Sequence, residues 1–224
     1  MSWPRTGDEL ACAQDELAAA EPASWHGGEE SDVGACIVVF PRGKTGAGDA
    51  GDPAWAAAAV LRGRRVVADA VVTGEAGAPY APGLLALREG PVLEAAVRAL
   101  PAGPDVLLTD ATGRDHPRRA GLALHLGAVL DLPTVGVTHR PLLAEGDWPP
   151  DVAGARSPLL LEGETVGSWL RTRPGTRPLA IHPGWRTDLD TAVEVVMSTG
   201  RGHRTPEPLR WARRLARMAR ARAR

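Results

Sequence analysis

The alternation of apolar and polar positions along the chain predicts strands and helices that follow one another from end to end. The segments with the apolar run and the short length of a strand are Val33–Phe40, Trp55–Leu61, Arg64–Thr73, Asp105–Thr109 and Thr134–Thr138. Only Arg62 and Gly63 join the second segment to the third, so a β-meander is the simplest interpretation. A further hairpin is expected where Leu159–Leu161 and Val166–Arg171 flank a Glu-Gly-Glu turn.

Apolar residues at helical spacing predict the other elements, which are Glu9–Ala20, Pro82–Leu100, His116–Leu130, Asp188–Ser198 and Pro206–Arg222. Pro117 suits the first turn of the third helix. Thr187 or Asp188 is expected to cap the fourth helix. Three opening strands followed by alternating helices and strands predict a mixed α/β sheet flanked by helices.

Composition narrows the class of protein. A length of 224 residues favours one domain over two and is enough to bury a core. The formal net charge of -1 means that any contact with nucleic acid must come from local basic patches. Cys12 and Cys36 lack the spacing of a zinc knuckle, so a reducing cytoplasm is expected. MSWPRTGDEL has no basic start or apolar run, and no stretch approaches the ~18 apolar residues of a membrane span. Neither a signal peptide nor membrane association is therefore expected.

The arginine-rich segment from Arg201 to Arg224 is the one charge-biased part of the chain. It has two compatible interpretations. It can be the solvated face of a helix, which an apolar stripe supports: Leu209, Ala212, Leu215, Ala216 and Ala219. It can also attract the phosphates of a nucleic acid.

Sequence blocks that carry more information follow one another through the chain. They are PYAPGLLALREGP (Pro79–Pro91), LLTDATGRDHPRRAGLALHLG (Leu107–Gly127), LPTVGVTHRPL (Leu132–Leu142), LRTRPGTRPLAIHPGWRTDLDTAVEVV (Leu170–Val196) and GHRTPEPLRWARRLA (Gly202–Ala216). In this order and spacing, the chain closely resembles the endonuclease V family from about Ala11 to Ala216.

The resemblance implies a ribonuclease H-like fold, here as one domain over residues 1–224 with a basic helical tail at about 206–224. It also implies an endonuclease of DNA repair that hydrolyses a phosphodiester near deaminated adenine (hypoxanthine) in DNA, or in RNA for some members. Such hydrolysis uses Mg²⁺ or Mn²⁺, which neutralises the phosphate and lowers the pKa of the attacking water. We expect a cytoplasmic monomer that binds nucleic acid.

The blocks also suggest which residues carry this chemistry. Hard cations prefer carboxylate oxygens, and Glu89 in a predicted helix and Asp110 at a strand end match the family's metal ligands. Tyr80 lies between two prolines, and by resemblance it is the wedge that fills the gap left by a displaced base. The predicted substrate-binding residues are Pro79, Tyr80, Pro82, Gly83, Ala111, Gly113 and His116.

The chain departs from the family pattern at four positions. Ile37 stands where the first strand of the family carries an aspartate, and Trp185 stands where the family has a late histidine. His139 replaces a lysine, although it is still expected to assist at the phosphate. Ala111 replaces a glycine that makes room for the base. Loss of one of three carboxylates is expected to weaken metal binding.

Two functions from different classes therefore follow from the resemblance. The first is a metal-dependent endonuclease of reduced activity, with Glu89, Asp110 and His139 as catalytic residues. The second is a relative that binds nucleic acid without cutting it.

Overall fold

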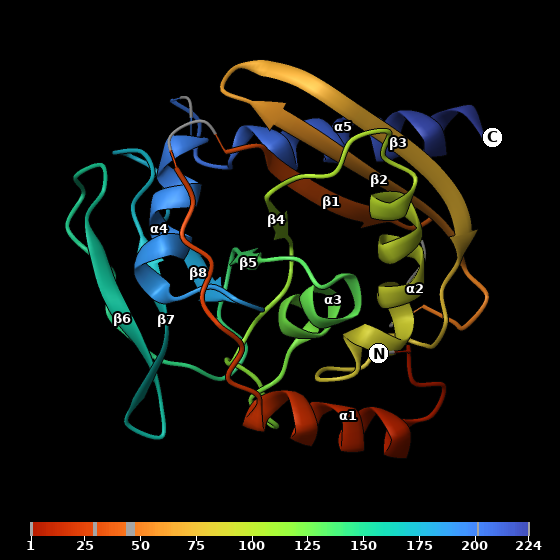
Figure 1. Ribbon diagram of the computed structural model, residues 1–224, viewed down its shortest axis with the longest axis horizontal. Coiled ribbons are helices and arrows are strands. Elements are labelled where there is room, and N and C mark those ends of the chain that lie inside the picture. The colour runs from red at the N-terminus through yellow and green to blue at the C-terminus, as the bar shows by residue number, and fades with distance from the viewer. Residues whose placement is uncertain (1, 29–30, 44–47, 201, 224) are drawn as a thin grey trace.

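The computed structural model describes residues 2–28, 31–43, 48–200 and 202–223. Its strands are β1 (Val33–Val39), β2 (Pro53–Arg62), β3 (Arg65–Glu75), β4 (Val106–Thr109), β5 (Thr134–Thr138), β6 (Arg156–Leu161), β7 (Glu164–Leu170) and β8 (Leu179–Pro183). They form one eight-stranded sheet in the order β3-β2-β1-β4-β5-β8-β7-β6. Figure 1 shows the β2–β3 hairpin at one edge and the β6–β7 hairpin at the other. The predicted mixed α/β sheet is confirmed.

The helices are α1 (Gly7–Ala19), α2 (Leu85–Arg98), α3 (Leu122–Leu130), α4 (Leu189–Ser198) and α5 (Glu207–Arg222). Two apolar clusters divide them between the faces of the sheet. One cluster packs Leu10 of α1, Leu93 of α2 and Leu126 of α3 against Cys36 and Ala56. The other packs α4 and α5 against alternate strand positions. The sheet is therefore the middle layer, as period-two alternation of buried residues requires.

Strand direction decides where a functional site forms. β1 pairs antiparallel with β2, and β2 with β3, which confirms the predicted meander. β4 lies between β1 and β5 and is parallel to both. The carboxyl ends of β1, β4 and β5 consequently meet at one edge of the sheet, where α/β proteins commonly bind their ligands.

The far half of the sheet is antiparallel. β6 and β7 form the predicted hairpin, and β8 pairs with both β7 and β5. The apolar pattern did not predict β8, because it is only five residues long and ends on Pro183. Its four leading residues are buried between two neighbouring strands, so long-range pairing rather than a local signal defines it.

The predicted helix His116–Leu130 is wrong at its start, because α3 begins only at Leu122. Long-range contacts hold the preceding residues in a turn. The buried Asp115 carboxylate accepts hydrogen bonds from the N–H groups of Leu142, Leu143 and Ala144 at 2.6 to 2.8 Å. Arg119 adopts a φ of 53°, which a continuous helix does not allow.

The arginine-rich C-terminal segment folds as α5 and packs on β1 and β2 through buried Leu209, Ala212 and Ala216. Its apolar stripe was expected from the sequence. No helix within the described ranges is long and apolar enough to cross a lipid bilayer.

The buried His125 of α3 makes the free energy of unfolding depend on pH. Its ring is fully buried and stacks on Trp3 with 4.6 Å between ring centroids. Neither ring nitrogen has a hydrogen-bond partner among the described residues. Burial lowers the pKa of His125 to about 4. The unfolded state therefore binds the proton more readily, and stability falls as the pH drops from about 6.5 towards 4.

We expect His125→Phe to reduce this loss by an amount on the order of 3 kcal/mol. Urea unfolding at pH 7.0, 5.5 and 4.5 measures it for both proteins. Identical pH dependence in the parent and the variant would show that His125 is not the titrating group.

Candidate active site

Glu89 and Asp110 lie at the edge of the sheet where β1 and β4 end. Both line a cavity of about 290 Å³, together with residues of β1 and two arginines of α5. Glu89 comes from the second turn of α2, and Asp110 directly follows β4. The structure thus brings together the two carboxylates that the sequence predicts as a pair. We call this pair and its cavity the acidic centre.

The surroundings of Glu89 change its pKa. Burial, reinforced by the negative charge of Asp110, raises the pKa of Glu89 to about 8. A carboxyl group with such a pKa binds a proton at neutral pH unless a positive charge stands nearby. The centre is therefore suited to a cation or to proton transfer.

A positive charge is already present beside Asp110. Arg213 of α5 donates a hydrogen bond from Nη2 to Asp110 Oδ2 at 3.0 Å. Arg217, four residues further along α5, also lines the cavity. No local pattern in the sequence indicates either role, because Arg213 is one of many arginines in the tail and its partner lies 103 residues away.

Ile37 is the β1 residue nearest to Asp110 on its face of the sheet. β1 and β4 are paired up to Cys36 and Thr109, and Ile37 and Asp110 follow these residues directly. Ile37 is 4% exposed and packs in the cluster that contains Ala35 and α5. An apolar side chain therefore stands beside Asp110.

Cys36 faces the other way, towards Glu89, in the wall of the same cavity. Burial raises the pKa of the Cys36 thiol to about 12, and the charge of Glu89 adds to this effect. Because the thiolate is the reactive form, Cys36 is not a nucleophile at neutral pH.

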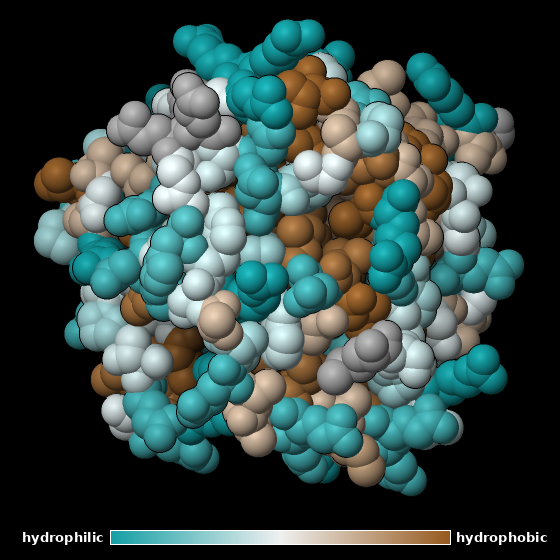
Figure 2. Space-filling view, in the orientation of Figure 1, coloured by the Kyte–Doolittle hydropathy of each residue, from teal (hydrophilic) through white to brown (hydrophobic). Residues whose placement is uncertain are grey.

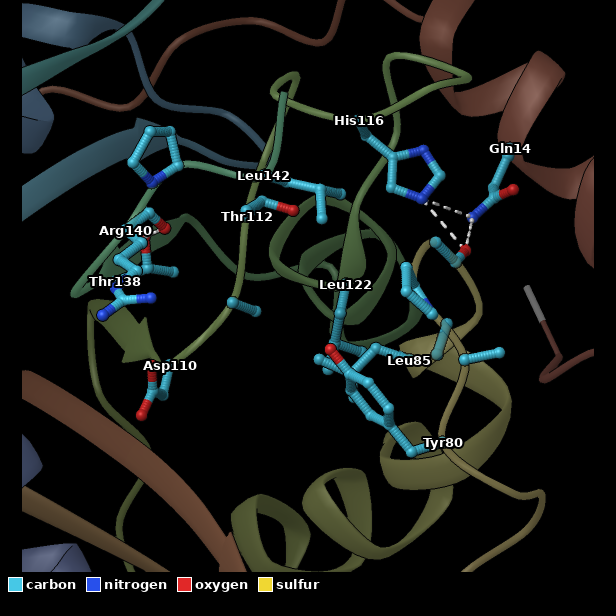
Figure 3. Close-up of a pocket in the computed structure, with 16 residues that line it drawn as sticks. Gln14, Tyr80, Leu85, Asp110, Thr112, His116, Leu122, Thr138, Arg140 and Leu142 are labelled. Carbon is cyan, nitrogen blue, oxygen red and sulfur yellow. Dashed lines mark hydrogen bonds between the residues drawn. The ribbon is translucent and has the colours of Figure 1, made fainter. Parts of the chain in front are cut away.

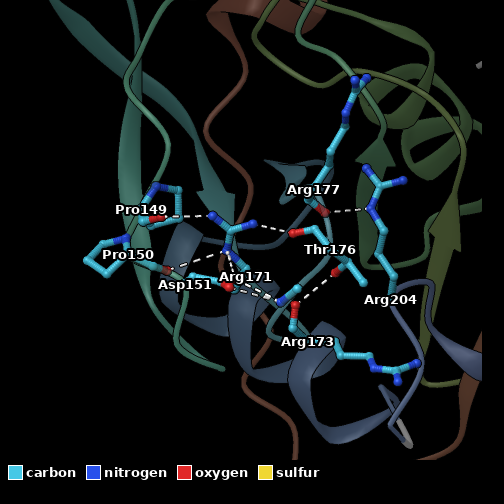
Figure 4. Close-up of polar contacts among 9 residues, drawn as sticks. Pro149, Pro150, Asp151, Arg171, Arg173, Thr176, Arg177 and Arg204 are labelled. Atoms are coloured by element: carbon cyan, nitrogen blue, oxygen red, sulfur yellow. Dashed lines mark hydrogen bonds and ion pairs between the residues drawn. The ribbon is translucent and has the colours of Figure 1, made fainter.

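His139 follows β5, at the same edge of the sheet as Asp110. Its pKa is lowered by burial and then by the charges of Arg204 and Arg213, while Asp110 raises it. Arg204 is itself fixed, because it donates to the Arg177 carbonyl at 2.6 Å (Figure 4) and to the Pro178 carbonyl at 2.8 Å. His139 therefore lies within a group of positive charges.

Trp185, which stands where the family pattern has a late histidine, lies away from the acidic centre. β8 runs antiparallel to β5, so the residues after β8 lie at the amino end of β5. There the main-chain carbonyl of Trp185 accepts a hydrogen bond from the N–H of Thr134, and its side chain packs near Leu124 and Ala128 of α3. Asp110 and His139 lie at the opposite, carboxyl ends of their strands. A match within a sequence motif did not reveal which edge of the sheet the residue occupies.

A second cavity of about 250 Å³ adjoins the acidic centre (Figure 3). Of the predicted substrate-binding residues, Tyr80, Pro82, Gly83, Ala111 and His116 line it. Pro79 and Gly113 are not among its lining residues. Gly113 instead packs so closely on β8 that an added Cβ would stand 2.1 Å from the Pro183 carbonyl oxygen.

A hydrogen-bonded group at the back of this second cavity fixes its shape. His116 Nδ1 accepts from the N–H of Arg118 at 3.1 Å, so in the neutral ring Nε2 carries the proton and donates to the Gly83 carbonyl at 3.0 Å. Gln14 donates to the same carbonyl at 3.2 Å. The sequence did not single out Gln14, because it reaches the cavity from α1, 69 residues before Gly83.

The two cavities share Tyr80, Leu85 and Asp110 in their walls. Tyr80 is 48% exposed, so its ring stands at the common rim. Figure 2 shows hydrophobic residues gathered near the middle of one face of the molecule, with hydrophilic residues covering much of the surrounding surface. We call the second cavity, which Tyr80, Pro82, Gly83, Ala111 and Leu122 help to line, the apolar cavity, and it adjoins the charged cavity of the acidic centre.

Comparison with known proteins agrees with this geometry. The family model described as Endonuclease V matches residues 43–214. The chain is 43% identical to endonuclease V of Roseiflexus sp. (strain RS-1) over 171 residues, which cover 75% of this chain and 77% of that protein. The chain belongs to the endonuclease V family.

Solved endonuclease V structures share the fold. The crystal structure of endonuclease V from Streptomyces avermitilis superposes with a TM-score of 0.89 at 37% identity, over 99% of this chain and 96% of that chain. Endonuclease V of Ciona intestinalis, in complex with DNA that contains an inosine followed by a ribo-adenosine, has a TM-score of 0.79 at 20% identity, over 97% and 98% of the two chains. The predicted ribonuclease H-like sheet is thereby confirmed.

The acidic centre of this endonuclease V chain fits a resident divalent cation poorly. Within the described part of the chain, no group of three or more His, Cys, Asp or Glu side chains is arranged to hold a metal ion. Ile37 adds no oxygen ligand, and Arg213 occupies one oxygen of Asp110. Two carboxylates alone hold a divalent ion weakly, because each anionic ligand contributes much of the affinity.

Arg88 is the residue that positions this part of the endonuclease V fold. It is 4% exposed and forms an ion pair with the buried Asp52 at 3.3 Å. It also donates to the carbonyls of Asp49 and Ala78 at 3.0 and 2.7 Å, and its guanidinium lies 4.2 Å from the Phe40 ring centroid. The Arg88 side chain therefore holds the end of β1, the start of β2 and the Tyr80 loop against α2, one residue before Glu89.

A second connection joins α2 to that loop. Pro91 has no N–H, so the Leu87 carbonyl, four residues earlier, lacks its helical donor. The Gly77 N–H donates to the Arg88 carbonyl at 3.1 Å. A Cβ on Gly77 would stand 2.2 Å from the Leu87 carbonyl oxygen, so this approach requires glycine.

We expect Arg88→Met to destabilise the fold by about 3–5 kcal/mol, because it leaves the buried Asp52 carboxylate without its guanidinium. Arg98→Met is the matched control, since Arg98 is in the same helix and pairs with Glu94 on the surface; it should cost less than about 1 kcal/mol. Denaturant unfolding measures both free energies. Equal costs would contradict the anchoring role of Arg88.

Proposed function

We propose that this chain, acting as one domain over residues 1–224, is an endonuclease V-type phosphodiester hydrolase. Its substrate is nucleic acid that contains deaminated adenine, and its rate is reduced. The observation that supports the proposal is the common wall of the two cavities, in which Asp110 and Tyr80 take part. A nucleotide whose base enters the apolar cavity has its backbone within reach of the acidic centre.

Each group in the apolar cavity has a role in this proposal. The base enters between Tyr80 and the wall that contains Ala111, while the Tyr80 ring stacks in the gap left in the strand. His116 and Gln14 hold the Gly83 carbonyl in place, so the backbone around Gly83 is rigid before the base arrives. The methyl group of Ala111 narrows the cavity relative to glycine.

The acidic centre supplies the groups for hydrolysis. Glu89, kept partly protonated by burial and by Asp110, can accept or donate a proton near the scissile bond. His139 lies close enough to Arg204 and Arg213 to share in holding the phosphate. Mg²⁺ or Mn²⁺ remains a prediction from the family resemblance, and the poor fit of the centre accounts for the reduced rate.

A second candidate function is binding without cleavage. The ion pair between Arg213 and Asp110 favours it, together with apolar Ile37 beside them. Both features leave the base cavity unchanged while they reduce the capacity for phosphodiester hydrolysis.

Cleavage of an inosine-containing oligonucleotide, with an adenine-containing strand as control, tests the first function in Mg²⁺ and in Mn²⁺. We expect slow, inosine-dependent cutting by the parent and faster cutting by Ile37→Asp, which adds a third carboxylate. A buried aspartate costs several kcal/mol without a cation, in order-of-magnitude terms. Ile37→Asp should therefore gain more thermal stability from added metal than the parent does.

Trp185→His is the matched control, because Trp185 lies at the other edge of the sheet and its replacement should leave the cleavage rate unchanged. A parent that binds the inosine strand selectively but cuts it at no measurable rate would support the second candidate. Full-rate cutting by the parent would refute the account of a weakened centre.

The proposed role of Tyr80 as a wedge predicts a separate result. Tyr80→Ala should weaken binding of an inosine-containing duplex about tenfold, since stacking of a base on an aromatic ring contributes about 1–3 kcal/mol. Tyr80→Phe keeps the ring and should bind like the parent. Fluorescence anisotropy measures both affinities, and equal binding by Tyr80→Ala and the parent would exclude a wedge at this position.

A further inference from the structure

Two arginines of α5 reach the acidic centre from the face of the sheet opposite α2. Arg213 and Arg217 are one helical turn apart, and both line the cavity that contains Glu89 and Asp110. In the pair of Arg213 with Asp110, the arginine side chain is 21% exposed and the aspartate 43%. The arginine side chain is therefore the more enclosed partner of the pair, and it forms part of the cavity wall.

The packing of α5 fixes which arginine enters. Leu209, Ala212 and Ala216 are buried against the sheet and set the rotation of the helix. Arg213 follows Ala212 directly, so its stem runs beside this buried stripe. Arg214 is exposed, and its guanidinium lies 5.6 Å from the Trp211 ring centroid. Two neighbouring arginines of equal charge thus have different surroundings, and only Arg213 contacts Asp110.

A surface ion pair that merely holds a helix in place is the simplest alternative. Such a pair contributes at most about 1 kcal/mol when it is partly exposed. The buried side chains of α5, among them Leu209, Ala212 and Ala216, already dock the helix on β1 and β2. The position of Arg213 is therefore not needed for docking, and it places a positive charge beside Asp110, in the wall of the cavity that also contains Glu89.

The balance of charge around the centre favours an anionic ligand. Arg213 and Arg217 stand in its wall, and Arg204 lies near enough to act on His139. Against them stand two carboxylates, Glu89 and Asp110. With a guanidinium in place, a second cation is repelled and a phosphate is attracted. Arginine is also the side chain whose fork of N–H donors best matches phosphate oxygens.

We propose that Arg213 fills the cation position of the acidic centre, where it neutralises Asp110 in the free protein and binds the phosphodiester of the recognised nucleotide. This inference rests on the proposed function, because it needs the nucleotide to reach the centre. It makes the binding of nucleic acid independent of divalent metal, and it makes Arg213 a competitor of metal for Asp110.

The experiment uses the full chain and three variants. Arg213→Gln removes the guanidinium, Arg214→Gln removes an equal charge one position away, and Asp110→Asn releases Arg213. Anisotropy with an inosine-containing single strand in EDTA gives affinities at several salt concentrations, and titration with Mn²⁺ alone gives metal affinity. Thermal melts check folding, and Arg213→Lys keeps the charge should Arg213→Gln fail to fold.

We expect Arg213→Gln to lose at least tenfold in affinity for the strand, with a salt slope lower by about one. Arg214→Gln should lose much less. Arg213→Gln should also bind Mn²⁺ more tightly than the parent, because both Asp110 oxygens become available. Asp110→Asn should bind the strand in EDTA at least as tightly as the parent, whereas a site held by metal would lose affinity. Arg213→Lys should bind the strand between the parent and Arg213→Gln.

The proposal is overturned if Arg213→Gln and Arg214→Gln bind the strand equally, or if Arg213→Gln leaves Mn²⁺ affinity unchanged. The failure of the proposed function looks different, because the parent would then show no preference for inosine over adenine. In that case the Mn²⁺ titrations still decide whether Arg213 occupies the cation position.

Discussion

The parallel pairing of β4 with both β1 and β5 is the constraint on which the candidate site depends. It directs three strand ends to one edge of the sheet, so residues that are far apart in the chain, such as Ile37, Asp110 and His139, approach each other there. The right-handed crossovers that parallel strands need are provided by helices, and one of them, α2, brings Glu89 to the same edge. Any charged side chain at these positions therefore interacts electrostatically with the others.

That environment determines how the charges of the acidic centre are balanced. Two carboxylates in a partly enclosed cavity repel each other, and a protein can relieve this with a metal ion, a bound proton or a basic side chain. Here the proton is indicated by the high pKa of Glu89 and the basic side chain by Arg213. With apolar Ile37 beside Asp110, the negative charge of the centre comes from two carboxylates, and the guanidinium of Arg213 offsets part of it.

The sequence predicted those parts of the fold that have local signals. The apolar runs of β1, β4 and β5 and the helical spacing of α2 and α5 were found because their periods are visible within a dozen residues. The sequence did not predict β8, because pairing with β5 defines that strand. It predicted too early a start for α3, because the bonds of Asp115 to the 142–144 segment hold the preceding residues out of the helix. In the site, motifs located Glu89, Asp110 and Tyr80. They could not show that Trp185 lies at the opposite edge of the sheet, and they could not reveal Arg213 or Gln14, whose contacts join distant segments.

The attachment of the Tyr80 loop to α2 has a mechanical consequence. Through Gly77 and Arg88, the loop that carries the exposed tyrosine is fastened to the helical turn that carries Glu89. The wedge and the acidic centre of the proposed function therefore share one support, so a change that frees the loop from α2 would alter both.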